Sequence, residues 1–185
     1  MIAFPNCFMV GLLEGLEDEC GQAWSIVMYR CGEWWGKRQM QRMERILGEH
    51  FGKPLHELPT AQVHATVLEG WATEGWGRLK LDLENLQHGF VFASVSSSPI
   101  TEAFLNSELD ARKRPVDFLT AGALAGMFSQ ASDSELIGYQ IACVTQGAEA
   151  NEFLIGQKEV LEDVQNMVKK GMSAAEILAS LTQAH

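Results

Sequence analysis

The chain has 185 residues, of which 46% are hydrophobic and 21% charged, the balance of an ordinary globular protein of one domain. Its formal net charge of −10 argues against nucleic-acid binding, because contacts with phosphates need a positive surface. No apolar run approaches the roughly 20 residues that span a bilayer, and the N-terminal apolar run lacks the basic start of a signal peptide. We therefore expect a cytoplasmic protein of residues 1–185 with reduced cysteines and no membrane span.

Residues 1–75 are predicted to be mainly helical, beginning with a pair of N-terminal helices. Apolar residues recur at helical spacing from about Phe8 to Cys20 and again from about Gln22 to His50. On the longer helix Gly32 and Gly36 lie four residues apart, a spacing that lets another backbone approach closely. A third helix is expected over Thr60 to Thr73, with Thr60 as its N-cap.

A local basic cluster lies on the long helix, at Lys37, Arg38, Arg42 and Arg45. Two interpretations stay open. The cluster could meet an acidic partner, an anionic head group or a second subunit. Alternatively it is a solvated helix face with ion pairs such as Glu33 and Lys37 at four-residue spacing.

Residues 76–156 are predicted to form a sheet with one central helix. Apolar and charged residues alternate around Leu79 to Leu83, and Phe90–Val95 is apolar on both faces, so two antiparallel strands are expected. Two further strands are expected over 136–145 and 151–155. The helix between the strand pairs starts at Pro115, contains Asp117 in its first turn and runs to about Gln130, with small residues on nearly every face.

Two further helix starts carry recognisable capping sequences. Ser98 and Pro99 are typical of an N-cap followed by proline at the first helical position. Within residues 157–185, a helix is expected from Lys158 to about Lys170. Ser173 and Glu176 form a capping box that opens a last helix. The fold class is therefore predicted as α+β, with an antiparallel sheet of about four strands packed by helices.

The segment from Arg114 to Gly156 resembles the 4-vinyl reductase-like domain family. The resemblance rests on its Arg-Pro-Val-x-Phe start, Gly122 and Gly126 on the helix, Cys143, Gly147, and the run Phe153-Leu154-Ile155. It implies a fold related to ligand-binding domains of aromatic-sensing regulators and to a subunit of vesicle-tethering complexes. It also implies that the chain binds a small hydrophobic molecule and forms a homodimer.

Part of the family has a zinc site. The resemblance implies that its four ligand positions correspond to Asp117, Gln140, Cys143 and Asn151 in this chain. Zinc favours thiolate, imidazole and carboxylate ligands, so two neutral amides make a tight site improbable. We therefore expect no metal and no other cofactor. Because Gln140 and Cys143 are three residues apart, a regular strand would point them to opposite faces, and only a bulge would bring both to one site.

Aromatic residues gather around the expected sheet and its small-residue helix. They are more often core than pocket in general, but the resemblance also supports a ligand cavity. The ligand-contacting residues predicted on this basis are Trp71, Trp76, Phe90, Phe92, Phe118, Gly122, Phe128 and Phe153.

Three functions remain open. The first is a non-enzymatic module that binds an aromatic, tetrapyrrole or lipid-like molecule between the sheet and the Pro115 helix. The second is an enzyme or accessory protein that acts on vinyl groups of chlorophyll-type tetrapyrroles, which the family name suggests. The third is a dimeric assembly or scaffold protein that uses the two N-terminal helices. Binding is the leading hypothesis because of the resemblance and the loss of most of the family's metal-site residues, and the sequence shows no familiar catalytic motif.

Overall fold

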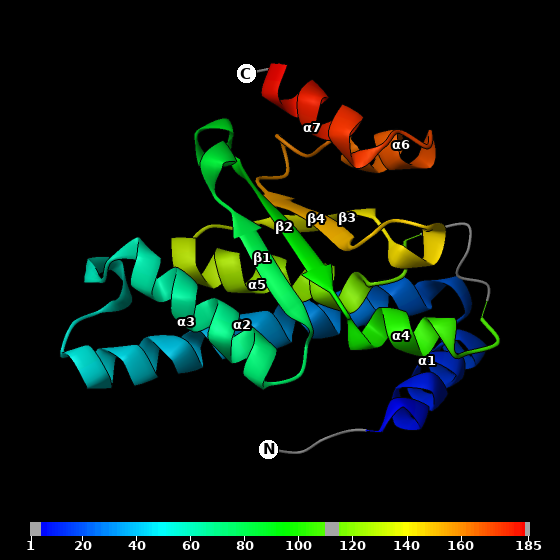
Figure 1. The fold of residues 1–185 in the computed structure, drawn as a ribbon, viewed down its shortest axis with the longest axis horizontal. Coiled ribbons are helices and arrows are strands. Elements are labelled where there is room, and N and C mark those ends of the chain that lie inside the picture. Colours follow the sequence, from blue (N-terminus) through cyan, green and yellow to red (C-terminus); the bar gives the residue numbers. More distant parts are fainter. Residues whose placement is uncertain (1–4, 110–114, 184–185) are drawn as a thin grey trace.

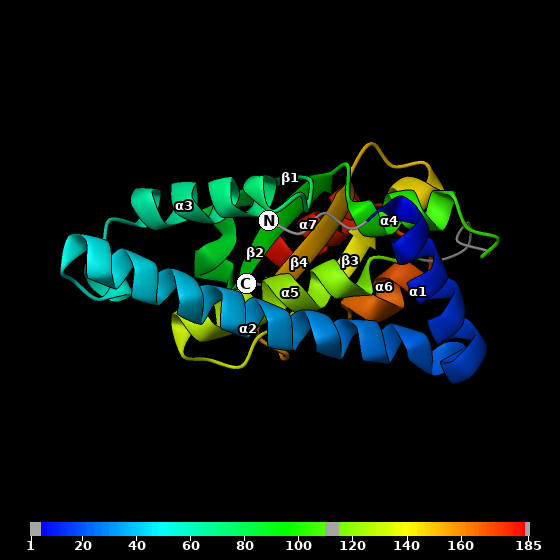
Figure 2. The same cartoon turned by 90° about the horizontal axis from the view of Figure 1, so that it is seen from below.

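The computed structural model describes residues 5–109 and 115–183. Arg114, which begins the family-like motif, lies outside these residues. The N-terminal part is helical, as predicted, and consists of α1 (Asn6–Cys20), α2 (Trp24–Phe51) and α3 (Thr60–Thr73), with short 3-10 turns at Gly21–Ala23 and Leu55–Glu57. Helix α2 runs along the length of the molecule (Figure 2).

The sheet is antiparallel throughout and has the strand order β1-β2-β4-β3. Its strands are β1 (Arg78–Asp82), β2 (Phe90–Ser96), β3 (Ile137–Ala142) and β4 (Asn151–Gly156). Helix α4 (Pro99–Leu105) and helix α5 (Phe118–Ser132) lie between the two strand pairs in sequence. Helices α6 (Val164–Lys169) and α7 (Ala174–Gln183) follow β4. The predicted α+β class is confirmed.

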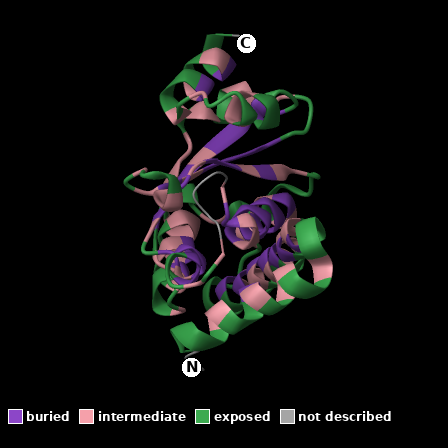
Figure 3. Ribbon diagram, turned by 90° about the vertical axis from the view of Figure 1, so that its right-hand side faces the viewer, coloured by how far each residue is buried: buried purple, intermediate pink, exposed green. Residues whose placement is uncertain are grey.

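The elements form three layers, with the sheet in the middle (Figure 1). Helices α2, α3 and α5 cover one face, while α6 and α7 cover the other. Alternate residues of one strand therefore enter different cores: Phe153 and Ile155 of β4 pack toward α5, and Leu154 packs toward the C-terminal helices. A third cluster joins α1 to α4 around Leu13, Trp24 and Phe104. Buried residues follow these inner surfaces (Figure 3).

Helices α2 and α5 approach each other more closely than side chains would allow. An added Cβ at Gly32 or Gly36 would overlap backbone atoms of α5, and one at Gly122 or Gly126 would overlap backbone atoms of α2. Each helix therefore supplies two glycines to the same contact. The four-residue spacing of Gly32 and Gly36 thus has the role that it suggested.

The ends of several elements differ from their predicted positions. Pro59 precedes α3, and its carbonyl oxygen accepts hydrogen bonds from Gln62 and Val63, so Thr60 is the first helical residue and not the cap. Asp117 caps α5 from outside the helix, because its carboxylate accepts the amide of Thr120. Both expected side-chain caps at Ser98 and Ser173 are present.

Two predicted elements are shorter in the structure. The strand expected over 136–145 ends at Ala142, because the chain turns into a 3-10 helix at Val144–Gln146. The helix expected from Lys158 begins only at Val164, since residues 157–163 form successive turns that bury Leu161 against the sheet. Within the described residues, no helix is long and apolar enough to cross a membrane.

Candidate functional site

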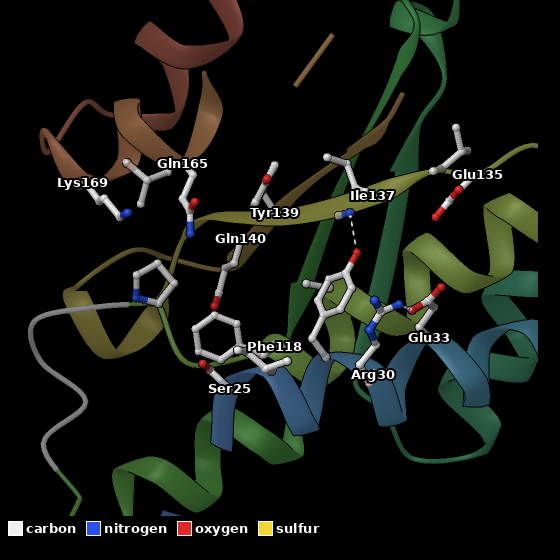
Figure 4. A pocket seen from close by; sticks show the side chains of 17 residues that line it. Ser25, Arg30, Glu33, Phe118, Glu135, Ile137, Tyr139, Gln140, Gln165 and Lys169 are labelled. Atoms are coloured by element: carbon white, nitrogen blue, oxygen red, sulfur yellow. Dashed lines mark hydrogen bonds and ion pairs between the residues drawn. The ribbon is translucent and has the colours of Figure 1, made fainter. Parts of the chain in front are cut away.

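A cavity of about 550 Å³ opens between α2, the start of α5, the edge strand β3 and α6 (Figure 4). Its volume lies in the range of known small-molecule sites, about 300–1,000 Å³. Apolar groups line most of its interior, and charged groups gather at its rim. The apolar and aromatic lining residues are Ile26, Tyr29, Pro115, Phe118, Ala121, Leu136, Ile137, Tyr139 and Val168.

Tyr29 contributes a polar group at the wall of the cavity. Its hydroxyl oxygen accepts a hydrogen bond of 3.0 Å from the backbone amide of Gly138. Burial raises the pKa of Tyr29, so the side chain is a neutral hydroxyl at physiological pH. Because the oxygen already accepts the Gly138 amide, the hydroxyl hydrogen is available to an acceptor on a bound molecule.

The position of Tyr29 follows from the close packing of α2 on α5. Its carbonyl oxygen lies against Gly122, one turn after Phe118, which lines the cavity from α5. Gly138 in turn leaves room for the Ala121 carbonyl, so β3 also approaches α5 closely. The glycines thereby bring three walls of the cavity together.

The rim near α2 is charged. Glu33 accepts hydrogen bonds from Arg30 at 2.7 Å and from Lys37 at 2.9 Å. Partial burial opposes ionisation of Glu33, but these two cations outweigh burial and lower the pKa of its carboxyl group. Glu135 and Lys169 line the rim near β3 and α6. The rim is therefore mixed in charge and does not select strongly for one sign.

Of the predicted ligand-contacting residues, Phe118 lines this cavity and the other seven do not. Trp71 and Trp76 pack around Trp35, with ring centroids 5.5 and 4.4 Å from it. Phe128 and Phe153 belong to or pack against the same core, whereas Phe90 and Phe92 lie on the opposite side of the sheet. Gly122 contacts the backbone of α2.

Sequence reasoning missed the contributions of α2 and α6 to the cavity. Tyr29 lies between Met28 and Cys31, two of the apolar residues that recur at helical spacing on α2. Its position in that pattern does not distinguish a residue of the cavity wall from a solvated one. Its aromatic ring with a polar tip was the one available signal. The α6 residues Gln165, Val168 and Lys169 have no such signal, because they reach the cavity only through the turn after β4.

Three of the four positions at which the resemblance implies zinc, Asp117, Gln140 and Asn151, are linked by hydrogen bonds next to the cavity. The fourth, Cys143, directly precedes Val144, whose amide also donates to Asn151. Strand β3 has a bulge: Gln140 pairs with Phe153 and Ala142 with the adjacent Glu152, so Ile141 is the extra residue. The bulge allows Gln140 and Cys143 to approach one region, as the spacing argument required. All four side chains are buried.

Hydrogen bonds connect two of these side chains, Gln140 and Asn151, to each other and to neighbouring elements. Gln140 accepts the backbone amide of Asp117 at 2.8 Å and donates to the side-chain oxygen of Asn151 at 3.1 Å. Asn151 donates to Thr101 at 2.7 Å and also accepts the backbone amide of Val144 at 3.1 Å. Cys143 lies 3.0 Å from the Thr145 hydroxyl and packs in the cluster with Leu13 and Trp24.

Asp117 completes the network. Its carboxylate accepts the Ser98 hydroxyl at 2.6 Å and the Thr120 amide at 3.1 Å, which links the caps of α4 and α5. Burial raises the pKa of Asp117, while these hydrogen bonds oppose that rise.

Residues 98–157 match the model of the 4-vinyl reductase-like domain, a segment that runs from the α4 cap to the turn after β4. This match confirms the resemblance over that segment. No curated protein sequence matches the chain.

Solved structures share the fold. The phenol-responsive sensory domain of the transcription activator PoxR, crystallised with phenol, has a TM-score of 0.72 and 15% identity, covering 91% of this chain and 83% of that one. A vinyl-4-reductase family protein from Methanocaldococcus jannaschii has a TM-score of 0.50 and 15% identity, covering 84% and 82%. A trafficking protein particle complex subunit 3 from Naegleria fowleri, covalently bound to palmitic acid, has a TM-score of 0.52 and 9% identity, covering 82% and 96%.

Proposed function

We propose that this chain, in which residues 98–157 match the 4-vinyl reductase-like domain, is a binding module for a small, mainly apolar molecule that carries a hydrogen-bond acceptor. The observation that carries the proposal is the cavity of about 550 Å³ with the Tyr29 hydroxyl in its wall. Two proteins of the same fold were solved with phenol and with palmitic acid, which supports a ligand of this class.

The lining explains why the ligand would be apolar with one polar end. Phe118, Ile137 and Val168 offer apolar surface, and burying such surface is worth roughly 25 cal/mol per Å². Tyr29 would donate a hydrogen bond to a carbonyl, ether or hydroxyl oxygen of the ligand. An aromatic compound fits this description best, and a lipid-like molecule or a tetrapyrrole is the alternative that the experiment can distinguish.

Native mass spectrometry of protein purified from its own host would identify a bound molecule. Titrations with phenol, a long-chain fatty acid and a porphyrin then rank the three ligand classes. Ser25 is half-buried at the cavity wall, so Ser25→Trp would fill the cavity and abolish binding. Ser180→Trp on α7 is the matched control, because Ser180 is also half-buried on a helix but lies outside the cavity.

Tyr29→Phe tests the polar contact separately. Losing one hydrogen bond of about 0.5–1.5 kcal/mol weakens binding by roughly 2- to 13-fold without blocking the cavity. The proposal fails if no ligand binds, or if Ser25→Trp binds as tightly as the control. Reduction of tetrapyrrole vinyl groups by the isolated protein would support the enzyme alternative instead.

We further propose that the chain forms a homodimer through the outer face of α2. Trp34 is 65% exposed, and Val27, seven residues earlier on α2, is exposed on the same side of the helix. The following turns of α2 carry Arg38, Arg42 and Arg45, whereas the α1 end that precedes α2 is acidic. An antiparallel pairing of two α2 helices about Trp34 would place each basic end near the partner's acidic end.

Sedimentation velocity tests the dimer. The wild-type chain is expected to sediment as a dimer at micromolar concentration, and Trp34→Glu as a monomer of unchanged circular dichroism. Leu86→Glu is the control, because Leu86 is also exposed but lies on the 3-10 helix before β2. A monomeric wild-type protein would contradict the proposal.

A further inference from the structure

The buried polar cluster beside the cavity lies where four elements meet. Ser98 and Thr101 come from the start of α4, Asp117 from the cap of α5, Gln140 from β3 and Asn151 from β4. Each of these side chains is at most 6% exposed. Asp117, Gln140 and Asn151, three of the four positions at which the resemblance implies metal ligands, therefore lie within one hydrogen-bonded cluster.

The donor set does not fit zinc. Within the described residues, no group of three histidine, cysteine or carboxylate side chains is arranged to hold a metal ion. The side-chain oxygens of Gln140 and Asn151 already accept protein N–H groups. Amide oxygens bind hard cations, whereas zinc prefers thiolate and imidazole ligands.

The network instead satisfies its own members. The Asn151 side chain accepts two hydrogen bonds and donates one to Thr101, and the Gln140 side chain accepts one and donates one. The Asp117 carboxylate accepts one bond from each of two helix starts, through the Ser98 hydroxyl and the Thr120 amide. Buried polar networks are stabilising only when their members are satisfied in this way.

We infer that this hydrogen-bond network takes the place of a metal ion, and that it holds α4, α5, β3 and β4 together without one. A metal would join the cap of α5 to β3 and β4 through coordination bonds. Here the Asp117 amide, the Gln140 side chain and the Asn151 side chain make the same connection, and Thr101 extends it to α4. The fold of this chain is thereby independent of metal supply.

The wild-type protein gives the primary test. Elemental analysis of protein purified with added zinc is expected to find far less than one zinc per chain, and the Tm is expected to be unchanged by EDTA or by zinc. One zinc per chain, or a Tm that falls on chelation, would overturn the inference.

A pair of asparagine variants tests the network itself. Asn151→Ala removes the residue with three hydrogen bonds and is expected to lower the Tm by about 3–10 °C. Asn166→Ala changes an exposed asparagine on α6 and is expected to shift the Tm by about 1 °C or less. Equal Tm values for the two variants would show that the network does not hold these elements.

A gain-of-function variant tests the convergence of the positions. Asp117→Cys, Gln140→Glu and Asn151→Cys together with the native Cys143 would create three thiolates and one carboxylate. Cobalt(II), used as the probe, is expected to give the intense absorption of tetrahedral thiolate coordination, which weakens when Cys143→Ser is added. A folded triple variant that binds no cobalt would contradict the convergence. If the triple variant does not fold, the wild-type metal content and the asparagine pair decide the inference.

Discussion

Replacing Gly122 by alanine should separate α2 from α5 and destabilise the whole protein. An added Cβ would lie 2.9 Å from the Tyr29 carbonyl carbon and 3.0 Å from the Glu33 amide nitrogen, and would overlap the Tyr29 carbonyl oxygen. Ordinary contact begins at 3.4 Å, so the carbonyl carbon alone requires a shift of about 0.5 Å. These are backbone atoms, and no side-chain rotation can relieve the overlap.

The size of the effect follows from two opposing terms. Overpacking of a close contact costs about 1–3 kcal/mol, occasionally more, and the overlap here is with backbone. Alanine in place of glycine favours a helix by about 1 kcal/mol. Because the overlapping atoms are backbone, we expect the overpacking term to lie near the upper end of its range, about 3 kcal/mol. After subtraction of the helix term, the free energy of unfolding should fall by about 2 kcal/mol. Binding at the cavity should weaken as well, because the shift moves Tyr29 away from Phe118.

Urea unfolding followed by circular dichroism measures this change, and Gly11→Ala provides the matched control. Gly11 is exposed on α1 and has no atom near its added Cβ, so the same substitution there should stabilise the protein by about 0.5–1 kcal/mol. The two variants therefore have opposite expected signs. A Gly122→Ala protein at least as stable as the wild type would refute the close packing of α2 on α5.

Three further changes test other parts of the fold. Burial raises the pKa of Asp117, so its contribution to stability is present below the pKa of an unfolded aspartate and is lost as pH rises through the folded value. Asp117→Asn should therefore gain stability relative to the wild type as pH rises above the pKa of an unfolded aspartate, measured by urea titrations, and a constant difference would contradict the pKa shift. Ser173→Ala removes the capping box with Glu176 and should lower the free energy of unfolding by about 1 kcal/mol, measured by thermal unfolding. An unchanged stability would show that the capping box does not stabilise α7. Phe153→Ala empties a fully buried site and should cost about 3–5 kcal/mol in the same assay, and a cost below about 1 kcal/mol would place Phe153 outside the core.

Local patterns in the sequence were sufficient for most of the fold. The alternation around Leu79 to Leu83 predicted β1, and the capping sequences at Ser98 and Ser173 predicted the starts of α4 and α7. These features depend on neighbouring residues, so the sequence contains them directly. The first half of the helix predicted after β4 is a series of turns instead. These turns bury Leu161 against strands that are distant in the sequence, so local spacing could not predict them.

The candidate cavity was harder to predict, since its walls come from four elements. The aromatic residues did not share one pocket: strand alternation sends Phe153 and Phe90 to opposite faces of the sheet, and Trp71 packs with other tryptophans. Local spacing did not predict the bulge at Ile141 either. The sequence indicated only that a bulge would be needed to bring Gln140 and Cys143 to one site. Phe118 lines the cavity because it lies in the first turn of α5, the helix that the sequence identified as one wall.

The hydrogen bond between Tyr29 and Gly138 also occupies a backbone amide at the edge of the sheet. Strand β3 is an edge strand, and an unpaired edge amide is a template for aggregation. The opposite edge, β1, carries the exposed charges of Arg78 and Lys80, whereas β3 has the Tyr29 hydroxyl in place on the Gly138 amide. Because the same hydroxyl lines the cavity, Tyr29→Phe would leave this amide without its hydrogen-bond acceptor, so one side chain serves both the cavity wall and the edge of the sheet.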